Sequence, residues 1–365
     1  MARRGGTVLV PSGRKGGYMD LDPGEIYFIR EQVGDGYSEY TKIGLVREKT
    51  GRSSLNRAKE HQTGNPRALV PVKVIHTVFV YETETTLHRE FANRRILPGE
   101  WFRLDNSELD QAISRCGDLA AKNLSYIPMF EQAEQLAQVP SAAQSLPATE
   151  EATRWGTEHR CATFGLQLIT KSLGQYKKFL VNAKARGIEV DDYIVISETA
   201  GRETIDKKLF EELHADIVKS FTTNSIVLKG KFAILPKKDE SFTSDSRLAD
   251  VVAATGTLDA AVSSADDSKS ALDQMHQVYL TLIGLQPVLT KSLSIAEANL
   301  QVLCGVNAGI EEVCLWPRIE EESSKTDWKS IKLAHPSDYA ACTRMGSSSQ
   351  RVNFMRGAGA ESSED

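Results

Sequence analysis

The strongest constraint on the fold is a series of short motifs between Gly24 and Leu104. Two segments rich in β-branched and aromatic residues, 26–29 and 42–45, flank a Gly-Asp-Gly turn at 34–36, a pattern that predicts a β-hairpin. The elements expected next are a helix, a strand and a helix, over 53–61, 70–81 and 84–94. This order predicts a compact α/β unit.

Composition and periodicity divide the rest of the chain. The expected segments are a flexible basic arm (1–23), the α/β unit (24–105), a helical extension (106–133), a linker (134–159), a second α/β domain (160–240), a helical C-terminal region (241–345) and a disordered tail (346–365). Apolar residues every four positions predict an amphipathic helix over 205–217. A later helix, beginning near Leu272, is expected to end near Pro287. No internal repeat is recognisable.

The composition is that of a globular protein. Of the 365 residues, 41% are hydrophobic and 25% are charged, and no purely apolar run reaches the roughly 18 residues that a membrane span needs. The N-terminal apolar stretch is too short for a signal peptide, so a soluble, cytoplasmic protein is expected. The five cysteines form no C-x-x-C pair, which argues against a disulfide framework and a zinc ribbon.

Charge is distributed unevenly along the chain. Residues 1–105 contain 17 Lys and Arg against 13 Asp and Glu, a net charge of +4, which leaves −9 for the remainder because the whole chain carries −5. A basic unit on an acidic body suits a polyanionic partner that binds at one place.

The ordered motifs resemble those of the GIY-YIG nuclease superfamily. They are GEIYFI (24–29), KIG (42–44), Arg57, QTGNP (62–66), ETTLH (84–88) and GEWF (99–102). A lysine in the second motif is typical of the short phage-type and bacterial branch of that superfamily. The resemblance implies a small three-stranded antiparallel sheet with flanking helices, and hydrolysis of a phosphodiester by in-line attack of water.

The resemblance also implies roles for individual residues. Tyr27 would be the general base, and Lys42 would hold the scissile phosphate or lower the pKa of that phenol. Arg57 would stabilise the transition state with its fork of donors. His88, one helical turn after Glu84, would orient water or protonate the leaving group.

A single divalent metal is expected at Glu84. One helical carboxylate suffices for Mg²⁺ or Mn²⁺, because Mg²⁺ keeps several of its waters. Arg52, Gly44 and Lys59 are the expected substrate-binding residues, and Arg52 competes with Arg57 for the role of transition-state cation. Glu100 is expected to form a salt bridge, while Trp101 and Phe102 are expected to pack in the core.

The resulting hypothesis is a metal-dependent DNA endonuclease. The C-terminal segments would recognise a target, a protein partner or a second copy, as in restriction, mobile-element or phage-defence proteins. RNA stays open as a substrate. Two alternatives also stay open: an inactive nucleic-acid-binding or regulatory protein that keeps the fold, favoured by Lys42 in place of tyrosine, and an interaction protein that acts through its acidic C-terminal part.

Overall fold

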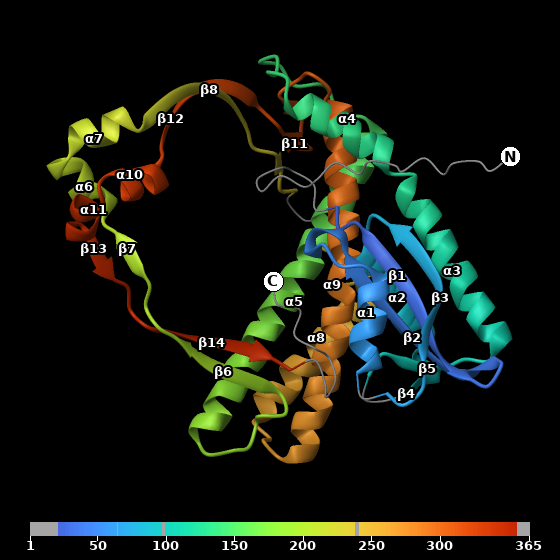
Figure 1. The fold of residues 1–365 in the computed structure, drawn as a ribbon. Coiled ribbons are helices and arrows are strands. Elements are labelled where there is room, and N and C mark those ends of the chain that lie inside the picture. Colours follow the sequence, from blue (N-terminus) through green and yellow to red (C-terminus); the bar gives the residue numbers. More distant parts are fainter. Residues whose placement is uncertain (1–20, 64, 97–98, 238–240, 356–365) are drawn as a thin grey trace, which may run out of the picture.

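The computed structural model describes residues 21–63, 65–96, 99–237 and 241–355. Most of the expected basic arm over 1–23 lies outside these residues. The chain is a mixture of helices and strands with a small antiparallel sheet, which confirms the coarse fold class. Figure 1 shows three parts: an N-terminal α/β module, a bundle of long helices, and an arch that leaves one end of the bundle and returns at the other.

The module is built on one antiparallel sheet of five strands in the order β3-β1-β2-β5-β4. The strands are β1 (Gly24–Val33), β2 (Gly36–Arg47), β3 (Leu69–Thr77), β4 (Arg95–Ile96) and β5 (Trp101–Arg103). The predicted hairpin is confirmed by the pairing of β1 with β2. The expected three strands were too few, because the very short β4 and β5 extend the sheet beyond β2 and are hard to recognise in sequence.

Helices cover both faces of this sheet. They are α1 (Ser54–Gln62), α2 (Val80–Glu90) and α3 (Asn106–Leu124), with 3-10 turns η1 (Glu48–Thr50) and η2 (Ala92–Arg94). Successive strand residues point to opposite faces. Phe28 therefore joins a core with Leu87 of α2, whereas Tyr27 joins a second core with Ala58 of α1. The module thus has two apolar layers, and Tyr27 belongs to the layer under α1.

Four helices and one 3-10 turn form the bundle. They are α4 (Ile127–Ala137), α5 (Glu150–Ala185), η3 (Ser246–Leu248), α8 (Ala249–Ser264) and α9 (Lys269–Cys304). The predicted linker over 134–159 is wrong at both ends, because α4 reaches residue 137 and the hydroxyl of Thr149 caps α5 by accepting from the amide of Ala152. Helix α9 also continues through Pro287, whose buried ring is part of the packed face.

Helix α9 is long and apolar enough, by length and composition alone, to cross a membrane. It is also a core helix of the bundle: Leu272, Tyr279 and Leu282 are at most 3% exposed and belong to one apolar cluster with residues of α5 and α8. It joins the bundle to the module as well, since Lys291 forms a largely buried ion pair of 3.0 Å with Glu82 of α2.

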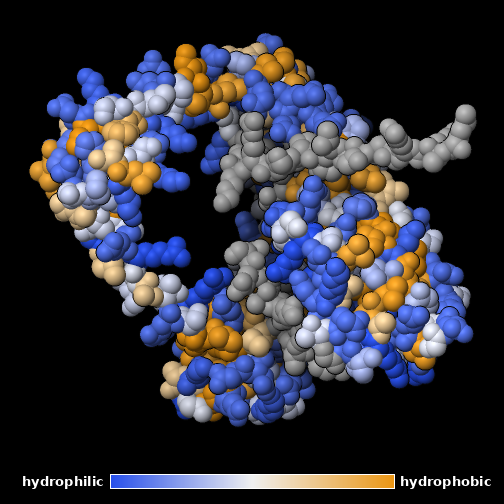
Figure 2. All heavy atoms as spheres, in the orientation of Figure 1, coloured by the Kyte–Doolittle hydropathy of each residue, from blue (hydrophilic) through white to orange (hydrophobic). Residues whose placement is uncertain are grey.

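The arch consists of two antiparallel limbs. The outgoing limb contains β6 (Ile194–Thr199), β7 (Glu203–Ile205), α6 (Lys207–Leu213), α7 (Ala215–Ser220), β8 (Thr222–Gly230) and β9 (Ala233–Ile234). The returning limb contains β10 (Gly309–Ile310), β11 (Cys314–Leu315), β12 (Arg318–Thr326), α10 (Trp328–Ala334), α11 (Pro336–Ala341), β13 (Thr343–Met345) and β14 (Ser349–Phe354). Figure 2 shows that the arch and the rest of the molecule surround an opening that stays clear in this view.

The structure of the arch contradicts three predictions about the C-terminal two thirds of the chain. The second α/β domain over 160–240 is not self-contained, because β6, β7, β8 and β9 pair with β14, β13, β12 and β11 of the distant returning limb. The region 241–345 is helical only to Cys304 and is then largely extended up to α10. The expected disordered tail contains β14 over 349–354, which is ordered by pairing with β6.

The tip of the arch contains an internal repeat that the sequence did not reveal. Asp206 and Asp327, 121 residues apart, each cap a short helix that is followed by a second one. The amide of each donates across to the other limb, to the carbonyls of Cys342 and Phe221. The predicted continuous helix over 205–217 is therefore wrong: it breaks at His214 so that both limbs can turn.

Candidate functional site

Tyr27 lies at the centre of a cluster of charged side chains. Its side chain is 1% exposed. Arg57 of α1 hydrogen-bonds to the phenol, and Nε2 of His61, one turn later, lies 3.4 Å from the phenol oxygen. The carboxylates of Glu84 and Glu100 are close enough to act on the pKa of the phenol. The fold thus brings together a phenol, a guanidinium, an imidazole and two carboxylates.

The phenol of Tyr27 is held in its protonated form. Burial is the largest cause that raises its pKa above the usual value, and Glu100 and Glu84 raise it further. Arg57 opposes them but is outweighed. The neighbouring cation Arg57 therefore does not bring this pKa below its usual value, and Tyr27 is better suited to donate a hydrogen bond than to act as the general base.

Lys42 forms an ion pair with Glu100. Its Nζ lies 2.9 Å from Oε2 of Glu100, which confirms the expected salt bridge of Glu100. The pairing of Lys42 with Trp101 in the β2–β5 ladder brings the preceding residue, Glu100, beside the lysine. Burial alone would raise the pKa of Glu100, but Lys42 brings it below its usual value. The carboxylate is therefore charged at neutral pH.

His88 lies against the sheet. Its Nε2 donates to the carbonyl of Ile43 at 2.9 Å, and its ring packs on Phe102 with 5.1 Å between ring centres. Burial lowers the pKa of His88 to about 4. A neutral imidazole already bonded to the backbone favours a positioning role for His88 over the expected proton transfer.

The lack of a side chain at Gly44 leaves the space that the ring of Tyr27 occupies. A Cβ on Gly44 would lie 2.4 Å from the phenol oxygen, so any other residue would displace the ring. The expectation that Gly44 binds substrate is corrected, because the side chain of Tyr27 lies against this glycine.

The two remaining predicted substrate-binding residues lie on or beside α1. Arg52 is exposed and reaches Oε2 of Glu60 at 3.9 Å, while Arg57 pairs with the same carboxylate. Lys59 is exposed two residues after Arg57, a spacing that turns it away from the face occupied by Arg57 and His61. The structure therefore gathers Arg57, and not Arg52 or Lys59, around Tyr27.

Glu84 is the predicted metal ligand. It is 8% exposed on α2 and electrostatically coupled to Tyr27. Among the residues that the structure describes, no group of three His, Cys, Asp or Glu side chains is placed to share one metal ion. The described residues therefore do not gather the donors of a zinc site, whereas a hydrated Mg²⁺ needs only one or two carboxylates.

His61 was not named as a site residue from the sequence, although the predicted helix over 53–61 ends at it. The signal was present in the spacing, since residues four apart share a helix face and Arg57 was already a candidate. Glu100 was recognised only as a salt-bridge partner, although it also faces the phenol.

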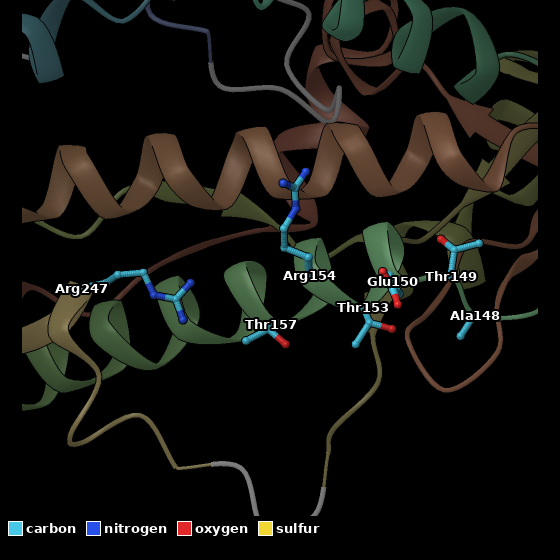
Figure 3. Close-up of a pocket in the computed structure, with 7 residues that line it drawn as sticks. All are labelled: Ala148, Thr149, Glu150, Thr153, Arg154, Thr157 and Arg247. Atoms are coloured by element: carbon cyan, nitrogen blue, oxygen red, sulfur yellow. The ribbon is translucent and has the colours of Figure 1, made fainter.

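Two surface pockets lie on different parts of the molecule. A shallow pocket of about 440 Å³ adjoins the cluster and shares His61 with it. A second pocket, of about 570 Å³, lies along the start of α5, where Arg247 comes beside Thr157 (Figure 3). Arg247 is already paired with Asp245 and Glu158, and this pocket shares no lining residue with the cluster.

Comparison with known proteins identifies a domain in the module. Residues 24–117 match the model of the T5orf172 domain, a segment that begins with β1 and ends within α3. This finding corrects the resemblance drawn from the motifs: T5orf172 is a different family from the GIY-YIG superfamily, although it is related to HNH-like and GIY-YIG-like endonuclease-associated domains in some contexts.

No curated protein and no solved structure matches the chain significantly. The T5orf172 domain is phage-associated and nuclease-like, and its presence suggests a DNA-related role.

Proposed function

We propose that the module hydrolyses phosphodiester bonds of DNA at the cluster around Tyr27. One observation carries the proposal: Arg57, His61, Glu84 and Glu100 surround the buried phenol of Tyr27. Grouping several ionisable side chains around one buried phenol is costly for folding, and such clusters are typical of catalytic sites. The match to a nuclease-like domain over 24–117 supports the same conclusion.

The side chains divide the chemistry among them. Arg57 binds the phosphate oxygens and stabilises the charge that develops on them. His61 is the general base that takes a proton from the attacking water, because imidazole exchanges protons near neutral pH. Tyr27 stays protonated and donates a hydrogen bond to the water or the phosphate. Lys42 keeps Glu100 charged, and the pair adds to the field around the site.

Glu84 is the residue that would hold a divalent cation, Mg²⁺ or Mn²⁺. A bound metal supplies charge stabilisation on the phosphate and the leaving oxygen. The fit rests on the donor chemistry, since a single carboxylate with water ligands is a common way to bind Mg²⁺.

The test is cleavage of plasmid, linear and single-stranded DNA by the full chain with and without Mg²⁺. Glu84→Gln should abolish cleavage without lowering the melting temperature by more than a few degrees. Glu90→Gln is the matched control, because Glu90 lies on the same helix but is exposed and paired with Arg115. Equal cleavage by Glu84→Gln and the unaltered chain would overturn the assignment of the site.

A second candidate is a nucleic-acid-binding protein without hydrolytic activity. Two observations favour it: the raised pKa of Tyr27 and the engagement of Lys42 by Glu100. Such a protein would bind DNA or RNA with an affinity that falls steeply with salt, and it would show no metal-dependent cleavage of either.

A further inference from the structure

The lining residues and the volume of the shallow pocket beside the cluster suit a nucleobase. Its lining residues are Glu31, His61, Thr63, Asn65, Pro66 and Trp101. They come from the end of β1, the end of α1 with the turn that follows it, and the start of β5. At about 440 Å³ the pocket has room for a planar ring together with water.

Trp101 provides an aromatic surface in this pocket. It is half-buried and packs against the core that contains Tyr27 and Ala58, so one side of its indole is supported by the protein. A supported indole is a good stacking partner for a base, and stacking is open to every base because each has a π-face. Trp101 directly follows Glu100, so the aromatic surface adjoins the charged cluster.

Glu31 also lines the pocket and provides a fixed hydrogen-bond acceptor. Its two carboxylate oxygens accept from Asn65 Nδ2 at 3.2 Å and from Arg67 Nη1 at 3.1 Å. The backbone amide of Arg67 in turn donates to Oδ1 of Asn65 at 3.0 Å. A carboxylate with one donor on each oxygen retains lone pairs, and these suit the exocyclic amino group of cytosine or adenine.

His61 connects the pocket to the reaction site. It lines the pocket, and its Nε2 also lies 3.4 Å from the phenol oxygen of Tyr27. A phosphate bound by Arg57, one turn before His61, would therefore bring the base of an adjoining nucleotide to the mouth of the pocket.

We propose that this pocket holds one unstacked nucleobase of the nucleic acid, next to the phosphate bound at the cluster. The proposal rests on the proposed function and deepens it by naming the substrate class. A base inside a duplex cannot reach such a pocket unless it is flipped out. The preferred substrate is therefore single-stranded or locally unpaired DNA, with an amino-bearing base at the position that enters the pocket.

The experiment measures binding separately from cleavage. Full-length protein carrying Glu84→Gln is titrated with single-stranded oligonucleotides that carry 2-aminopurine at successive positions, and with the matching duplexes. Stacking on Trp101 should quench 2-aminopurine at one position. Trp101→Leu should abolish that quenching and weaken single-strand binding about tenfold, whereas Trp101→Phe should retain most of both. Tyr37→Leu is the control, since Tyr37 is an exposed aromatic residue beside the turn of the β1–β2 hairpin and does not line the pocket.

A second variant keeps the test decisive if Trp101→Leu does not fold. Glu31→Gln should reduce the preference for oligo-dC over oligo-dT to near unity, because an amide presents a donor beside its acceptor. The pocket is refuted if Glu31→Gln leaves the base preference unchanged, or if a folded Trp101→Leu variant keeps the position-dependent quenching. It is also refuted if the unaltered chain shows no position-dependent quenching.

These outcomes are distinct from failure of the proposed function. Metal-dependent cleavage with no change in quenching or base preference on substitution of Trp101 and Glu31 would refute the pocket and leave the proposed hydrolysis intact. Position-dependent quenching without any cleavage would support the pocket and refute hydrolysis.

Discussion

Two Lys–Glu ion pairs of nearly equal length show how the module differs from the arch. Lys42 and Glu100 are 2.9 Å apart in the module, and Lys229 and Glu321 are 2.8 Å apart in the arch. The module pair has side-chain exposures of 9% and 34%, whereas the arch pair has 58% and 50%. Since water screens the second pair more strongly than the first, equal geometry has unequal consequences.

The same contrast applies to the regions as a whole. The module buries charged groups around Tyr27, where each changes the pKa of its neighbours. The arch exposes most of the charges along its two-stranded ribbons, and its tip has a small core of its own, built on Phe210, Ile331 and Cys342. Buried charge in a small domain indicates chemistry. Exposed charge on a ribbon is typical of strands that must not pair with other chains.

The largest difference between the two regions is expected for removal of an arginine. Arg57→Ala should slow DNA cleavage about a thousandfold, about 4 kcal/mol in activation free energy, because the phosphate loses its cation. Arg202→Ala removes an exposed arginine of the arch and should leave the rate within about twofold. Steady-state rates on one plasmid substrate measure both. Similar losses in the two variants would place the reaction outside the module.

Removing the core of the arch tip should affect the arch alone. Phe210 is completely buried, and Phe210→Ala is expected to cost about 3 kcal/mol. Hydrogen exchange should then accelerate in α6, α7, α10 and α11 while amides of β1 keep their protection. If exchange in β1 rose equally, the two regions would fold as one cooperative unit and the contrast drawn above would fail.

The module should lose stability on mild acidification through His88. Its pKa in the folded protein is about 4, below the value near 6.5 expected when unfolded. The unfolded chain therefore binds more protons between these values, and stability falls as the pH drops through this window, by at most about 3 kcal/mol. Three neighbouring charges also act on the pKa of His88: Glu100 raises it, whereas Arg95 and Lys42 lower it.

Urea melts at pH 7.0 and 5.0 measure the effect, with His88→Gln as the comparison. The variant should lose less stability over this range than the unaltered chain. An identical pH dependence in both would show that His88 is not the titrating group.

The smallest difference is expected for the two ion pairs themselves. Lys42→Met leaves Glu100 partly buried without its cation and should cost about 2 kcal/mol, a figure reduced because Glu100 is a third exposed. Lys229→Met should cost less than about 0.5 kcal/mol. Chemical denaturation of both variants measures these two losses in the free energy of unfolding. Equal losses would mean that burial does not distinguish the two ion pairs.

The sequence predicted local elements well where their determinants were local. The hairpin around Gly34 and the presence of a helix around Leu87 depend on nearby turn chemistry and periodicity. The bounds of that helix were wrong, because α2 spans Val80–Glu90 and not 84–94, and β3 ends at Thr77 and not at residue 81. The arch could not be predicted, because β6 acquires its partner only in β14. Helix α9 passes through Pro287 because packing on both sides outweighs one missing hydrogen bond.

The candidate site was also only partly predictable. Tyr27, Arg57 and Glu84 were named from sequence, and the structure brings them together. The pKa of Tyr27 could not be foreseen, since it depends on burial and on two carboxylates from separate elements. His61 could have been found from its helical spacing to Arg57.

The pairing of β6 with β14 has a consequence for how the protein is made. Ile194 pairs with Phe354 and Thr199 with Ser349, so each residue meets a partner that is synthesised 150 to 160 residues later. The outgoing limb must leave the ribosome with its backbone hydrogen bonds unmade and wait while α8 and α9 form. Contacts so distant along the chain form slowly. The arch is therefore the last part to close. A chain released from a ribosome that stalled within α9 would carry a folded module attached to an outgoing limb whose partner strands are missing.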